Sequence, residues 1–434
     1  MLSKFLQSVH VPHMKNTALQ VPVRMPAPAS VTIPMSMHIG APAKPVVKPG
    51  DTVKVGQLIA EAGGFVSAPI HATVSGTVKK IDDVLTSAGS YSQAVIIESD
   101  GLMEPYEGLQ KPEIPDFDAF IDAVRASGCV GLGGAGFPTA VKLKVDPEKV
   151  DYILVNGAEC EPYITSDTHT MVDNTDRILR GLSELRRFYP KAKIVIGIEN
   201  NKPVSIKTLK ERLTEIGNAE VCALPSSYPQ GGEKVLIYNI TGRVVPEGKL
   251  PIDAGCIVIN TTTLAFLGKY LNTGMPLVTK CVTIDGSAVK EPKNVIVPIG
   301  TLMKDVVEFA GGLKEEPKKV LYGGPMMGIS VPDLCQPVMK STNAILCFAE
   351  KEATLPEPTA CIHCGRCVDA CPMNLMPTEM EQATEAVDIE RLQKLKVNLC
   401  MECGSCSFVC PAKHNLVESH KLAKLLLKGA SAKK

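Results

Sequence analysis

Cys361-x2-Cys364-x2-Cys367-x3-Cys371-Pro372 is one of two stretches that decide how the last part of this chain folds. Cys400-x2-Cys403-x2-Cys406-x3-Cys410-Pro411 repeats the same spacing further along. In each stretch three cysteines recur at every third position, which lets a loop wrap around one face of a cubane iron–sulfur cluster. Because the fourth iron of such a cluster needs a thiolate from elsewhere, we expect the two stretches to fold around each other.

Both stretches have the spacing that bacterial ferredoxins use for [4Fe–4S] clusters, in which the fourth cysteine of each run ligates the other cluster. This predicts a first ligand set of Cys361, Cys364, Cys367 and Cys410, and a second ligand set of Cys371, Cys400, Cys403 and Cys406. Zinc is the alternative, but zinc sites usually combine two separated cysteine pairs. Two identical quartets, each closed by Cys-Pro, favour iron–sulfur clusters that transfer single electrons in sequence.

The composition excludes several classes of protein. The 434 residues carry no formal net charge and only 4% aromatic residues, whereas nucleic-acid binders need clustered positive charge or aromatic stacking platforms. An odd number of cysteines, 15, in a chain without an apparent leader indicates the reduced cytoplasm rather than disulfides. No apolar run approaches the ~20 residues of a transmembrane helix, so any membrane link is expected to come through a partner.

The patterning predicts a multidomain α/β plus β fold with four domains. Residues 1–112 carry prolines and short alternating strands, which are typical of a small all-β unit. In residues 113–272 apolar strands alternate with amphipathic helices, which indicates an α/β domain. Residues 273–350 return to short strands and one helix, as in a β-grasp module. Residues 351–434 hold both cysteine stretches, a helical segment between them and a basic tail, which we expect to be disordered unless it docks to a partner or to anionic lipid.

The N-terminal unit resembles the biotinyl and lipoyl barrel-sandwich domain. In that family a Glu-Ala-Met-Lys turn presents the lysine that is modified. The matching turn here is Glu61-Ala62-Gly63-Gly64, so a glycine stands at the lysine position. The resemblance therefore implies a structural scaffold rather than a carrier with a swinging arm.

A second functional candidate is the glycine-rich stretch Gly131-Leu-Gly-Gly-Ala-Gly-Phe-Pro-Thr139, which precedes a helix expected at Ala140–Lys144. Glycines let backbone N–H groups approach a phosphate closely, and a helix N-terminus adds a favourable dipole. Lys142 would add a positive charge. The stretch fits neither the G-x-G-x-x-G fingerprint, because the preceding residues are predicted to be helical, nor the P-loop, because no Gly-Lys-Ser/Thr follows. A tight structural turn is the alternative.

Four ordered motifs resemble the NADH-oxidising flavoprotein subunit of respiratory complex I. Gly131–Lys142 resembles that family's flavin and nicotinamide loop. Asn156-Gly-Ala-Glu-Cys-Glu-Pro162 is similar to its Asn-Ala-Asp-Glu-Gly-Glu-Pro. Tyr228-Pro-Gln-Gly-Gly-Glu233 is similar to its Tyr-x-x-Gly-Glu-Glu, and Asn260-Thr-Thr-Thr-Leu264 to its Asn-Val-Glu-Thr-Leu. The resemblance implies an α/β domain that binds FMN and NAD(H).

The resemblance also implies a role for each matched residue. The FMN phosphate and ribityl chain would be held by Gly131, Gly133, Gly134 and Lys142. The flavin would be lined by Asn156, Glu159, Tyr228, Gly231 and Asn260. NADH would contact Phe137, Glu161, Glu233 and Lys249. Three positions depart from the family pattern, namely Ala158, Cys160 and Gly232. Without the motifs, Glu161 and Glu233 would be interpreted as solvated surface carboxylates.

The domain order resembles the C subunits of the Rnf complexes, which are membrane-bound ferredoxin:NAD oxidoreductases. Val9-His-Val-Pro-His13 and Met37-His-Ile-Gly-Ala-Pro42 are similar to that family's N-terminal region. The resemblance implies a barrel-sandwich domain, a complex I flavoprotein-like domain, a β-grasp (SLBB-like) module and a helical two-cluster ferredoxin domain. It also implies a peripheral subunit on the cytoplasmic face of the membrane, without a transmembrane segment of its own.

The activity implied is an NADH-dependent oxidoreductase within a translocase. The subunit would exchange a hydride between NAD(H) and FMN and pass single electrons through two [4Fe–4S] clusters. Its partners would be the ferredoxin-type and membrane subunits of the Rnf complex, which move Na⁺ or H⁺. One alternative is a soluble NADH-dependent electron-transfer protein that serves a cobalamin or amino-acid reductase. Another is a cluster-bearing docking scaffold, if Ala158 and Gly232 mark a degenerate flavin pocket.

Overall fold

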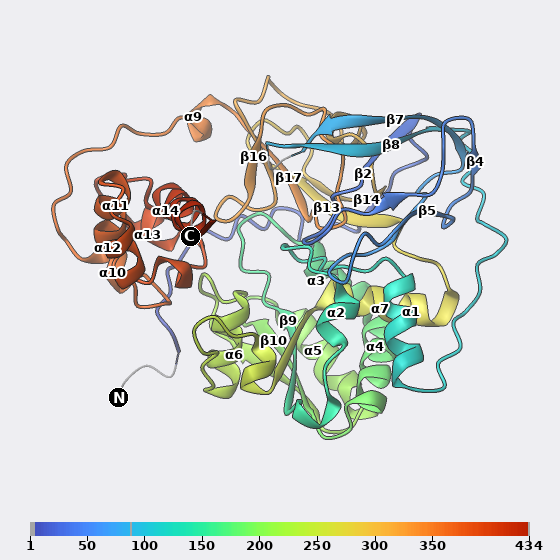
Figure 1. The fold of residues 1–434 in the computed structure, drawn as a ribbon, viewed down its shortest axis with the longest axis horizontal. Coiled ribbons are helices and arrows are strands. Elements are labelled where there is room, and N and C mark those ends of the chain that lie inside the picture. Colours follow the sequence, from blue (N-terminus) through green and yellow to red (C-terminus); the bar gives the residue numbers. More distant parts are fainter. Residues whose placement is uncertain (1–4, 87–88, 433–434) are drawn as a thin grey trace.

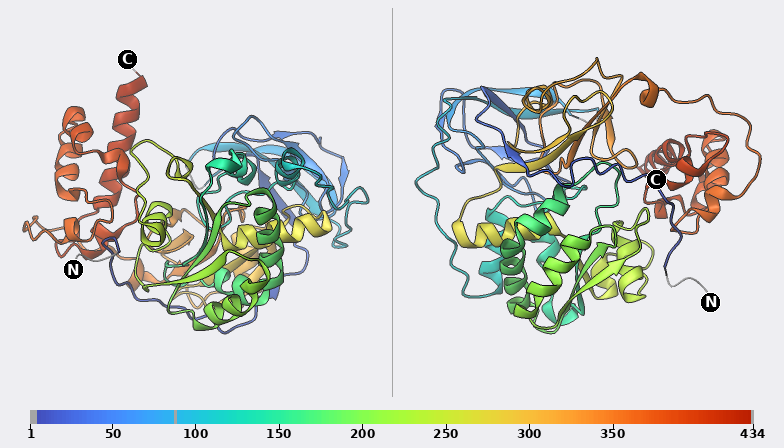
Figure 2. Two further views of the ribbon diagram at one scale, coloured as in Figure 1. Left: turned by 90° about the horizontal axis from the view of Figure 1, so that it is seen from below. Right: turned by 180° about the vertical axis from the view of Figure 1, so that it is seen from behind.

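The structure is a computed structural model that describes residues 5–86 and 89–432. Two β-rich parts lie side by side over an α/β domain, and a small helical domain with the cysteine stretches stands to one side (Figure 1). Figure 2 shows the same grouping from below and from behind. These four parts confirm the predicted fold class. The residue numbers proposed for the domain boundaries stay predictions.

The N-terminal domain consists of two small sheets around one core. A four-stranded antiparallel sheet has the order β2-β8-β7-β4, with bounds Ser30–Pro34, Tyr91–Ser99, Gly76–Leu85 and Thr52–Val53. A three-stranded sheet has the order β3-β5-β6, with bounds Lys44–Pro45, Leu58–Glu61 and Ile70–His71. Alternate residues such as Val31 and Ile33 point into the shared core.

The turn that follows β5 is closed against the chain beside it. A Cβ atom added to Gly63 would lie 1.9 Å from the carbonyl oxygen of Pro42, and one added to Gly64 would lie 3.4 Å from the Cβ of Ala41. A side chain therefore cannot be introduced at Gly63 without moving the backbone. This packing supports the interpretation of the domain as a scaffold.

The segment that precedes the sandwich runs over the rest of the molecule. Strand β1, Val23–Arg24, pairs in parallel with β14, Lys293–Pro298, far along the chain. Further back, Val9 and Tyr228 form an isolated antiparallel bridge with N···O distances of 2.8 Å in both directions. We call residues 5–24 the N-terminal arm. The sequence placed them in the first domain, whereas their partners lie in the second and third.

The α/β domain contains a parallel sheet with the order β11-β10-β9-β12. Their bounds are Ala219–Leu224, Lys193–Glu199, Tyr152–Gly157 and Cys256–Asn260. Because β10 and β11 extend the sheet on one side of β9 and β12 lies on the other, the strand order reverses between β9 and β12. Ligands bind outside the carboxyl ends of the strands at such a reversal.

Helices cover both faces of this sheet (Figure 1). One face packs against α1, α4, α5 and α7, with bounds Phe117–Ala126, Thr175–Phe188, Pro203–Arg212 and Thr261–Thr273. The other face packs against α6, Glu233–Thr241. Ile153 and Val155 of β9 face the first group of helices and Leu154 faces α6, as expected for a strand buried on both sides. The short helices α2 and α3 span Thr139–Leu143 and Ser166–Asp173.

The third part is a mixed sheet with the order β1-β14-β13-β17-β15-β16. Strands β13, β15, β16 and β17 span Thr279–Asp285, Lys319–Tyr322, Ile329–Val331 and Ala344–Phe348, and α8 spans Met303–Phe309. Strand β13 pairs in parallel with β17, while β15 runs antiparallel to both of its neighbours. The short helix α9, Glu350–Ala353, leads to the cysteine domain.

The cysteine domain is helical. Helices α10 and α13, Arg366–Asp369 and Ser405–Val409, lie within the two cysteine stretches. The connecting segment forms two helices, α11 and α12, at Pro377–Glu385 and Ile389–Lys394, separated at Val387, which has φ +51°. Helix α14, Leu416–Ala432, packs on α11 and α12. The prediction of a disordered basic tail was wrong as far as Ala432, because Ala423 and Leu427 anchor this end in the core; the last two residues lie outside the described part.

Candidate functional site

Two asparagines mark the point where the strand order reverses. Asn156 in β9 and Asn260 at the end of β12 are paired in register across neighbouring strands. The Asn260 side-chain oxygen caps α7 by accepting the N–H groups of Thr262 and Thr263, and its Nδ2 donates to Asp167 at 2.7 Å. Asn156 Nδ2 donates to the carbonyl of Gly231 at 2.8 Å. These bonds hold both side chains at the edge where a ligand is expected.

The glycine-rich stretch folds over the same edge. Its ends are joined by a bridge between Val130 and Pro138. A Cβ atom at Gly133 would lie 2.6 Å from Asn260 Nδ2, so only glycine permits this approach. Gly133 and Gly134 are exposed, and the space around Gly134 is open. Exposed backbone with room above it fits an anionic phosphate, which supports the prediction of a phosphate cradle over that of a plain turn.

Lys142 lies on α2, which begins directly after this stretch, as predicted. Its Nζ donates to Glu233 Oε1 at 2.7 Å and to the carbonyl of Val258 at 3.0 Å. Both side chains are about one third exposed, at 31% for Lys142 and 40% for Glu233, so each can also meet a ligand from solvent. A charge-assisted bond of this kind orients the ammonium without removing it from the site.

The loop that follows β9 carries the two other predicted carboxylates. Glu159 has φ +47°, and its carboxylate accepts bonds of 2.6 Å from the N–H of Asp167 and the hydroxyl of Thr168. Glu161 accepts the N–H groups of Met326 and Met327 at 3.1 and 2.8 Å. Burial raises the pKa of Glu161 to about 7. Both carboxylates therefore accept hydrogen bonds that fix the backbone of neighbouring segments.

Tyr228 joins the flavin-like motifs to the cysteine domain. It is fully buried, and its hydroxyl donates to the carbonyl of Cys403 at 2.6 Å. Nearby, the N–H of Gly231 lies 3.3 Å from the Sγ of Cys160. A Cβ atom at Gly232 would lie 2.3 Å from the methyl group of Met401. Two of the three departures from the complex I pattern, Cys160 and Gly232, are thus explained by local packing, and Gly232 makes room for the second cysteine stretch.

Not every residue predicted to bind FMN or NADH is connected to the site residues described above. Lys249 is exposed in the segment after α6, and among the described residues it has no hydrogen bond or ion pair with the other candidates. Phe137 is half-buried within the glycine-rich stretch. Sequence reasoning missed Lys15 and Lys202, whose ammonium groups hold the loop after β9. Lys202 follows the carboxyl end of β10, which was a usable signal; no local signal marks Lys15.

The second ligand set lines a single cavity. Its walls include Cys371, Cys400, Cys403 and Cys406, with His420 of α14 beside them. Lys424, also on α14, donates to the carbonyl of Cys400 at 2.6 Å. A cavity with one cysteine from the first stretch and three from the second matches the crossed arrangement predicted from the spacing. Four thiols in the walls of one cavity supply the ligand type and number that a cubane cluster needs.

The first ligand set lies at the outside of the domain. Cys364 is exposed together with Ile362 and His363. Cys367 and Cys410 are buried, and Cys367 packs against Cys406 of the other set. Of the seven cysteines outside the stretches, Cys129, Cys256 and Cys347 are buried and the others are partly or fully exposed.

Four protein families match the chain in order. They are the RnfC barrel sandwich hybrid domain at residues 3–102, the Nuo51 FMN-binding domain at 124–268, the SLBB domain at 281–330 and the 4Fe-4S dicluster domain at 360–414. Among curated relatives, the C subunit of the Na(+)-translocating ferredoxin:NAD(+) oxidoreductase complex of Acetobacterium woodii is 43% identical over 97% of this chain and 96% of its own length. The chain belongs to this family of C subunits.

Two further members of the family are similar to this chain over most of its length. The C subunit of the proton-translocating ferredoxin:NAD(+) oxidoreductase complex of Clostridium ljungdahlii is 43% identical over 87% of this chain and 84% of its own length. The C subunit of the ion-translocating oxidoreductase complex of Pseudomonas aeruginosa is 39% identical over 87% of this chain, which spans 50% of that protein's length. This C-subunit homologue is thus an electron-transfer oxidoreductase subunit with an FMN-binding domain and a domain for two [4Fe–4S] clusters.

A solved structure shares the fold of most of the chain. The NAD+-reducing [NiFe]-hydrogenase in the air-oxidized state has a TM-score of 0.51 at 19% identity, covering 70% of this chain and 63% of that chain. At this identity the likeness concerns the fold alone. No helix in residues 5–86 and 89–432 of the C-subunit homologue is long and apolar enough to cross a membrane.

Proposed function

We propose that this chain is the subunit at which NAD(H) reacts in an ion-translocating ferredoxin:NAD oxidoreductase complex. The observation that carries the proposal is the hydrogen bond from Tyr228 to the carbonyl of Cys403. It connects a residue of the flavin-like site directly to a residue of the second ligand set. When bound, FMN joins the two-electron hydride chemistry of NAD(H) to the one-electron chemistry of the clusters.

The residues around the carboxyl ends of β9 and β12 would bind FMN. Gly131, Gly133 and Gly134 would offer backbone N–H groups to the phosphate, with Lys142 supplying positive charge. The flavin would be lined by Asn156, Glu159, Tyr228, Gly231 and Asn260. Of these, Asn156 and Asn260 already have fixed orientations through their bonds to Gly231 and Asp167. A preorganised set of this kind loses little entropy when the ligand binds.

The NAD(H) contacts are proposed for Phe137, Glu161, Glu233 and Lys249. Glu233 is the freer carboxylate, because its only side-chain partner among the described residues is Lys142. Glu161 would have to release the N–H groups of Met326 and Met327 before it could contact a nucleotide. We therefore expect Glu233 to contribute more to NADH affinity than Glu161.

The two ligand sets suggest an order for electron transfer. The second set, with Cys403, lies against the flavin-like site, whereas Cys364 of the first set is exposed. We infer that the second set holds the cluster nearer to FMN and that the first set holds the cluster that meets the partner subunit. The partners would be ferredoxin-type and membrane subunits, with this subunit peripheral on the cytoplasmic face. The match of residues 3–102 to the RnfC sandwich disfavours the soluble alternative.

Anaerobic addition of NADH to the purified, reconstituted protein tests the proposal. Optical and EPR spectra should show bleaching of the flavin band together with a reduced-cluster signal. Bound iron and sulfide without flavin, and without any response to NADH, would contradict the proposal and favour a scaffold. Glu233→Gln should raise the KM for NADH more than Glu161→Gln does. The reverse order would contradict the proposed nucleotide contacts.

A further inference from the structure

The N-terminal arm is attached to the loops that carry the flavin-like motifs. Val9 exchanges both backbone hydrogen bonds with Tyr228, and the carbonyl of His13 accepts the N–H of Tyr163 at 3.0 Å. Thr17 Oγ1 lies 2.5 Å from Thr165 Oγ1 in a buried contact. The arm therefore follows the rim of the site from the Tyr228 loop to the end of the loop after β9.

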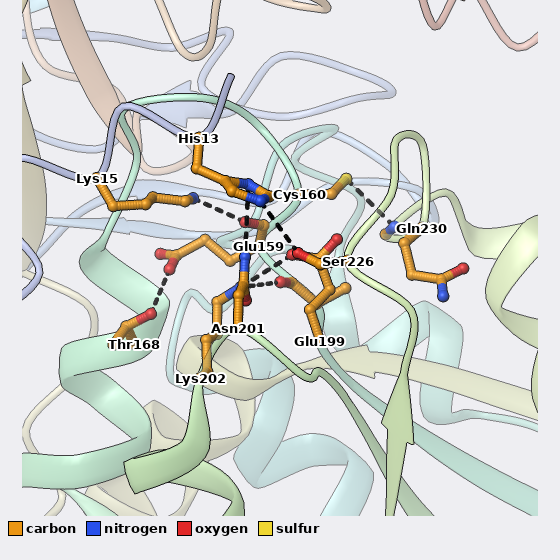
Figure 3. Close-up of polar contacts among 12 residues, drawn as sticks. His13, Lys15, Glu159, Cys160, Thr168, Glu199, Asn201, Lys202, Ser226 and Gln230 are labelled. Atoms are coloured by element: carbon orange, nitrogen blue, oxygen red, sulfur yellow. Dashed lines mark hydrogen bonds and ion pairs between the residues drawn. The ribbon is translucent and has the colours of Figure 1, made fainter. Parts of the chain in front are cut away.

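Lys15 makes the most extensive of these contacts. Its Nζ donates to the carbonyl oxygens of Glu159 at 2.8 Å, Glu161 at 2.8 Å and Ile164 at 2.6 Å. An ammonium group has three protons to donate, so this one is fully used within a single loop. Burial lowers the pKa of Lys15, while the Glu159 carboxylate opposes that shift. Figure 3 shows Lys15 reaching toward Glu159 from the arm.

Lys202 holds the beginning of the same loop. It is buried, and its Nζ donates to the carbonyl of Ala158 at 2.6 Å, to Glu199 Oε2 at 3.0 Å and to Asn201 Oδ1 at 2.9 Å. Lys202 follows β10 and Lys15 comes from the arm, and both groups lie around the same loop in Figure 3. Together they bind the carbonyls of Ala158, Glu159, Glu161 and Ile164.

The loop needs such support because its backbone is strained. Glu159 and Tyr163 have φ values of +47° and +69°, which are uncommon for residues with side chains. Strained backbone of this kind persists only where surrounding structure fixes it. The same loop contacts the segment that carries Tyr228 and Gly231, since the N–H of Gly231 lies 3.3 Å from Cys160 Sγ. A shift of the loop would therefore also move this segment, which forms the other side of the site.

We propose that the N-terminal arm is part of the flavin site and that Lys15 is a positioning residue, which holds the Ala158–Ile164 loop in the geometry that binds FMN. The proposal rests on the proposed function, because it assumes that FMN binds at this edge of the sheet. A second consequence follows from charge. Lys202 is paired with the Glu199 carboxylate, whereas Lys15 donates to backbone carbonyls, so the Lys15 ammonium favours the addition of electrons to a bound flavin and raises its reduction potential.

The test compares Lys15→Gln with Lys304→Gln, in which an exposed lysine of α8 is changed in the same way. FMN affinity is measured by fluorescence titration of the deflavinated full-length protein, and the FMN midpoint potential by anaerobic titration. Lys15→Gln should raise the dissociation constant about tenfold, as expected for the loss of charge-assisted bonds. It should also lower the potential. Lys304→Gln should change neither value.

The outcomes separate the two proposals. If the wild-type protein does not bind FMN, the proposed function fails. If the wild type binds FMN and Lys15→Gln has the same affinity and potential, the role of Lys15 is refuted while the function stands. A loss of thermal stability with unchanged affinity and potential would likewise refute positioning and leave a purely structural role.

A second variant covers the case in which Lys15→Gln does not fold. Val9→Pro removes the N–H that donates to the carbonyl of Tyr228, because proline has no backbone donor, and it also replaces a buried side chain that packs with Tyr228 and Cys403. Val9 lies outside the cores of the α/β domain and of the N-terminal domain. Weaker FMN binding in this variant is expected if the arm belongs to the site. Wild-type affinity in Val9→Pro would overturn the role of the arm.

Discussion

The two cysteine stretches have the same local conformation and opposite surroundings. His363 and Glu402 stand at equivalent positions, with φ values of +52° and +57°. Their N–H groups lie 3.5 and 3.4 Å from the sulfurs of Cys361 and Cys400. The first stretch nevertheless exposes Cys364, whereas the second is covered by neighbouring domains. The spacing therefore determines the loop, and the tertiary contacts determine which loop faces the flavin site and which faces solvent.

The glycines within the stretches show the difference most directly. Gly365 and Gly404 have φ values of +76° and +83°, so both need glycine for the same backbone reason. A Cβ atom on Gly365 would meet nothing within 4 Å. One on Gly404 would lie 2.9 Å from the carbonyl oxygen of Met326. At this glycine position, therefore, the second stretch packs closely against another domain and the first does not.

The largest effect is expected from Cys403→Ala in the second stretch. Reduction of an external one-electron acceptor by NADH should fall about 100-fold or more, because loss of a direct ligand exceeds the usual effect of losing its outer partners. NADH should still bleach the flavin band. Stopped-flow spectra with the iron content as control measure both steps. If the variant reduced the acceptor at the wild-type rate, the second ligand set would not lie on the path of electrons from FMN to the acceptor.

Cys364→Ala in the exposed stretch should have a smaller effect on the isolated subunit. One cluster should still be reduced by NADH, so that the EPR spin count falls from about two to about one per protein. Transfer to the rest of the complex should be lost, which membranes that contain the assembled complex would reveal. If flavin bleaching disappears in this variant, the proposed order of the two sets is wrong.

Gly404→Ala and Gly365→Ala form a matched pair that isolates the domain contact. Both changes introduce the strain of a left-handed alanine, roughly 1–2 kcal/mol. Gly404→Ala adds overpacking against Met326, so its total loss should reach roughly 2–4 kcal/mol. Denaturation followed through cluster absorbance compares the two. Equal losses of unfolding free energy would mean that packing against Met326 does not constrain Gly404 more than Gly365 is constrained.

The smallest effect is expected from Tyr228→Phe. The carbonyl of Cys403 loses its donor within a buried contact, which should cost about 1 kcal/mol and lower the melting temperature of the cysteine domain. Tyr270→Phe, which changes another buried tyrosine of the α/β domain, is the control. If the melting temperature fell equally in both variants, the Tyr228 hydroxyl would not stabilise the contact between the domains.

Much of this arrangement could be predicted from the sequence. The alternation of apolar strands and helices predicted for residues 113–272 is present, with β9 and β10 among its strands, and the helix expected after the glycine-rich stretch is α2. Buried parallel strands give continuous apolar runs that are easy to recognise. The cysteine spacing also predicts the crossed ligand sets, because it describes a geometry rather than a composition; the assignment of each cysteine to a cluster stays a prediction.

The remaining features depend on contacts between distant segments. Lys15 binds carbonyls in a loop more than a hundred positions along the chain, and backbone acceptors leave no trace in a side-chain pattern. The helix at the basic end was missed because its lysines were interpreted as a solvated tail, while Ala423 and Leu427 supply its packing. Lys249 was placed with the nucleotide contacts by resemblance alone, and the structure leaves it apart from them.

The pairing of β1 with β14 has a consequence for how the protein is made. Val23 and Arg24 leave the ribosome early, but their partners Val295 and Ile296 are synthesised only after most of the chain has emerged. Contacts between such distant segments form late, because the entropy of closing a long loop must be overcome first. The β1 end of the N-terminal arm should therefore stay unattached until the third domain exists, whereas the contacts of the arm with Tyr228 and with the loop after β9 can form before residue 293 is made.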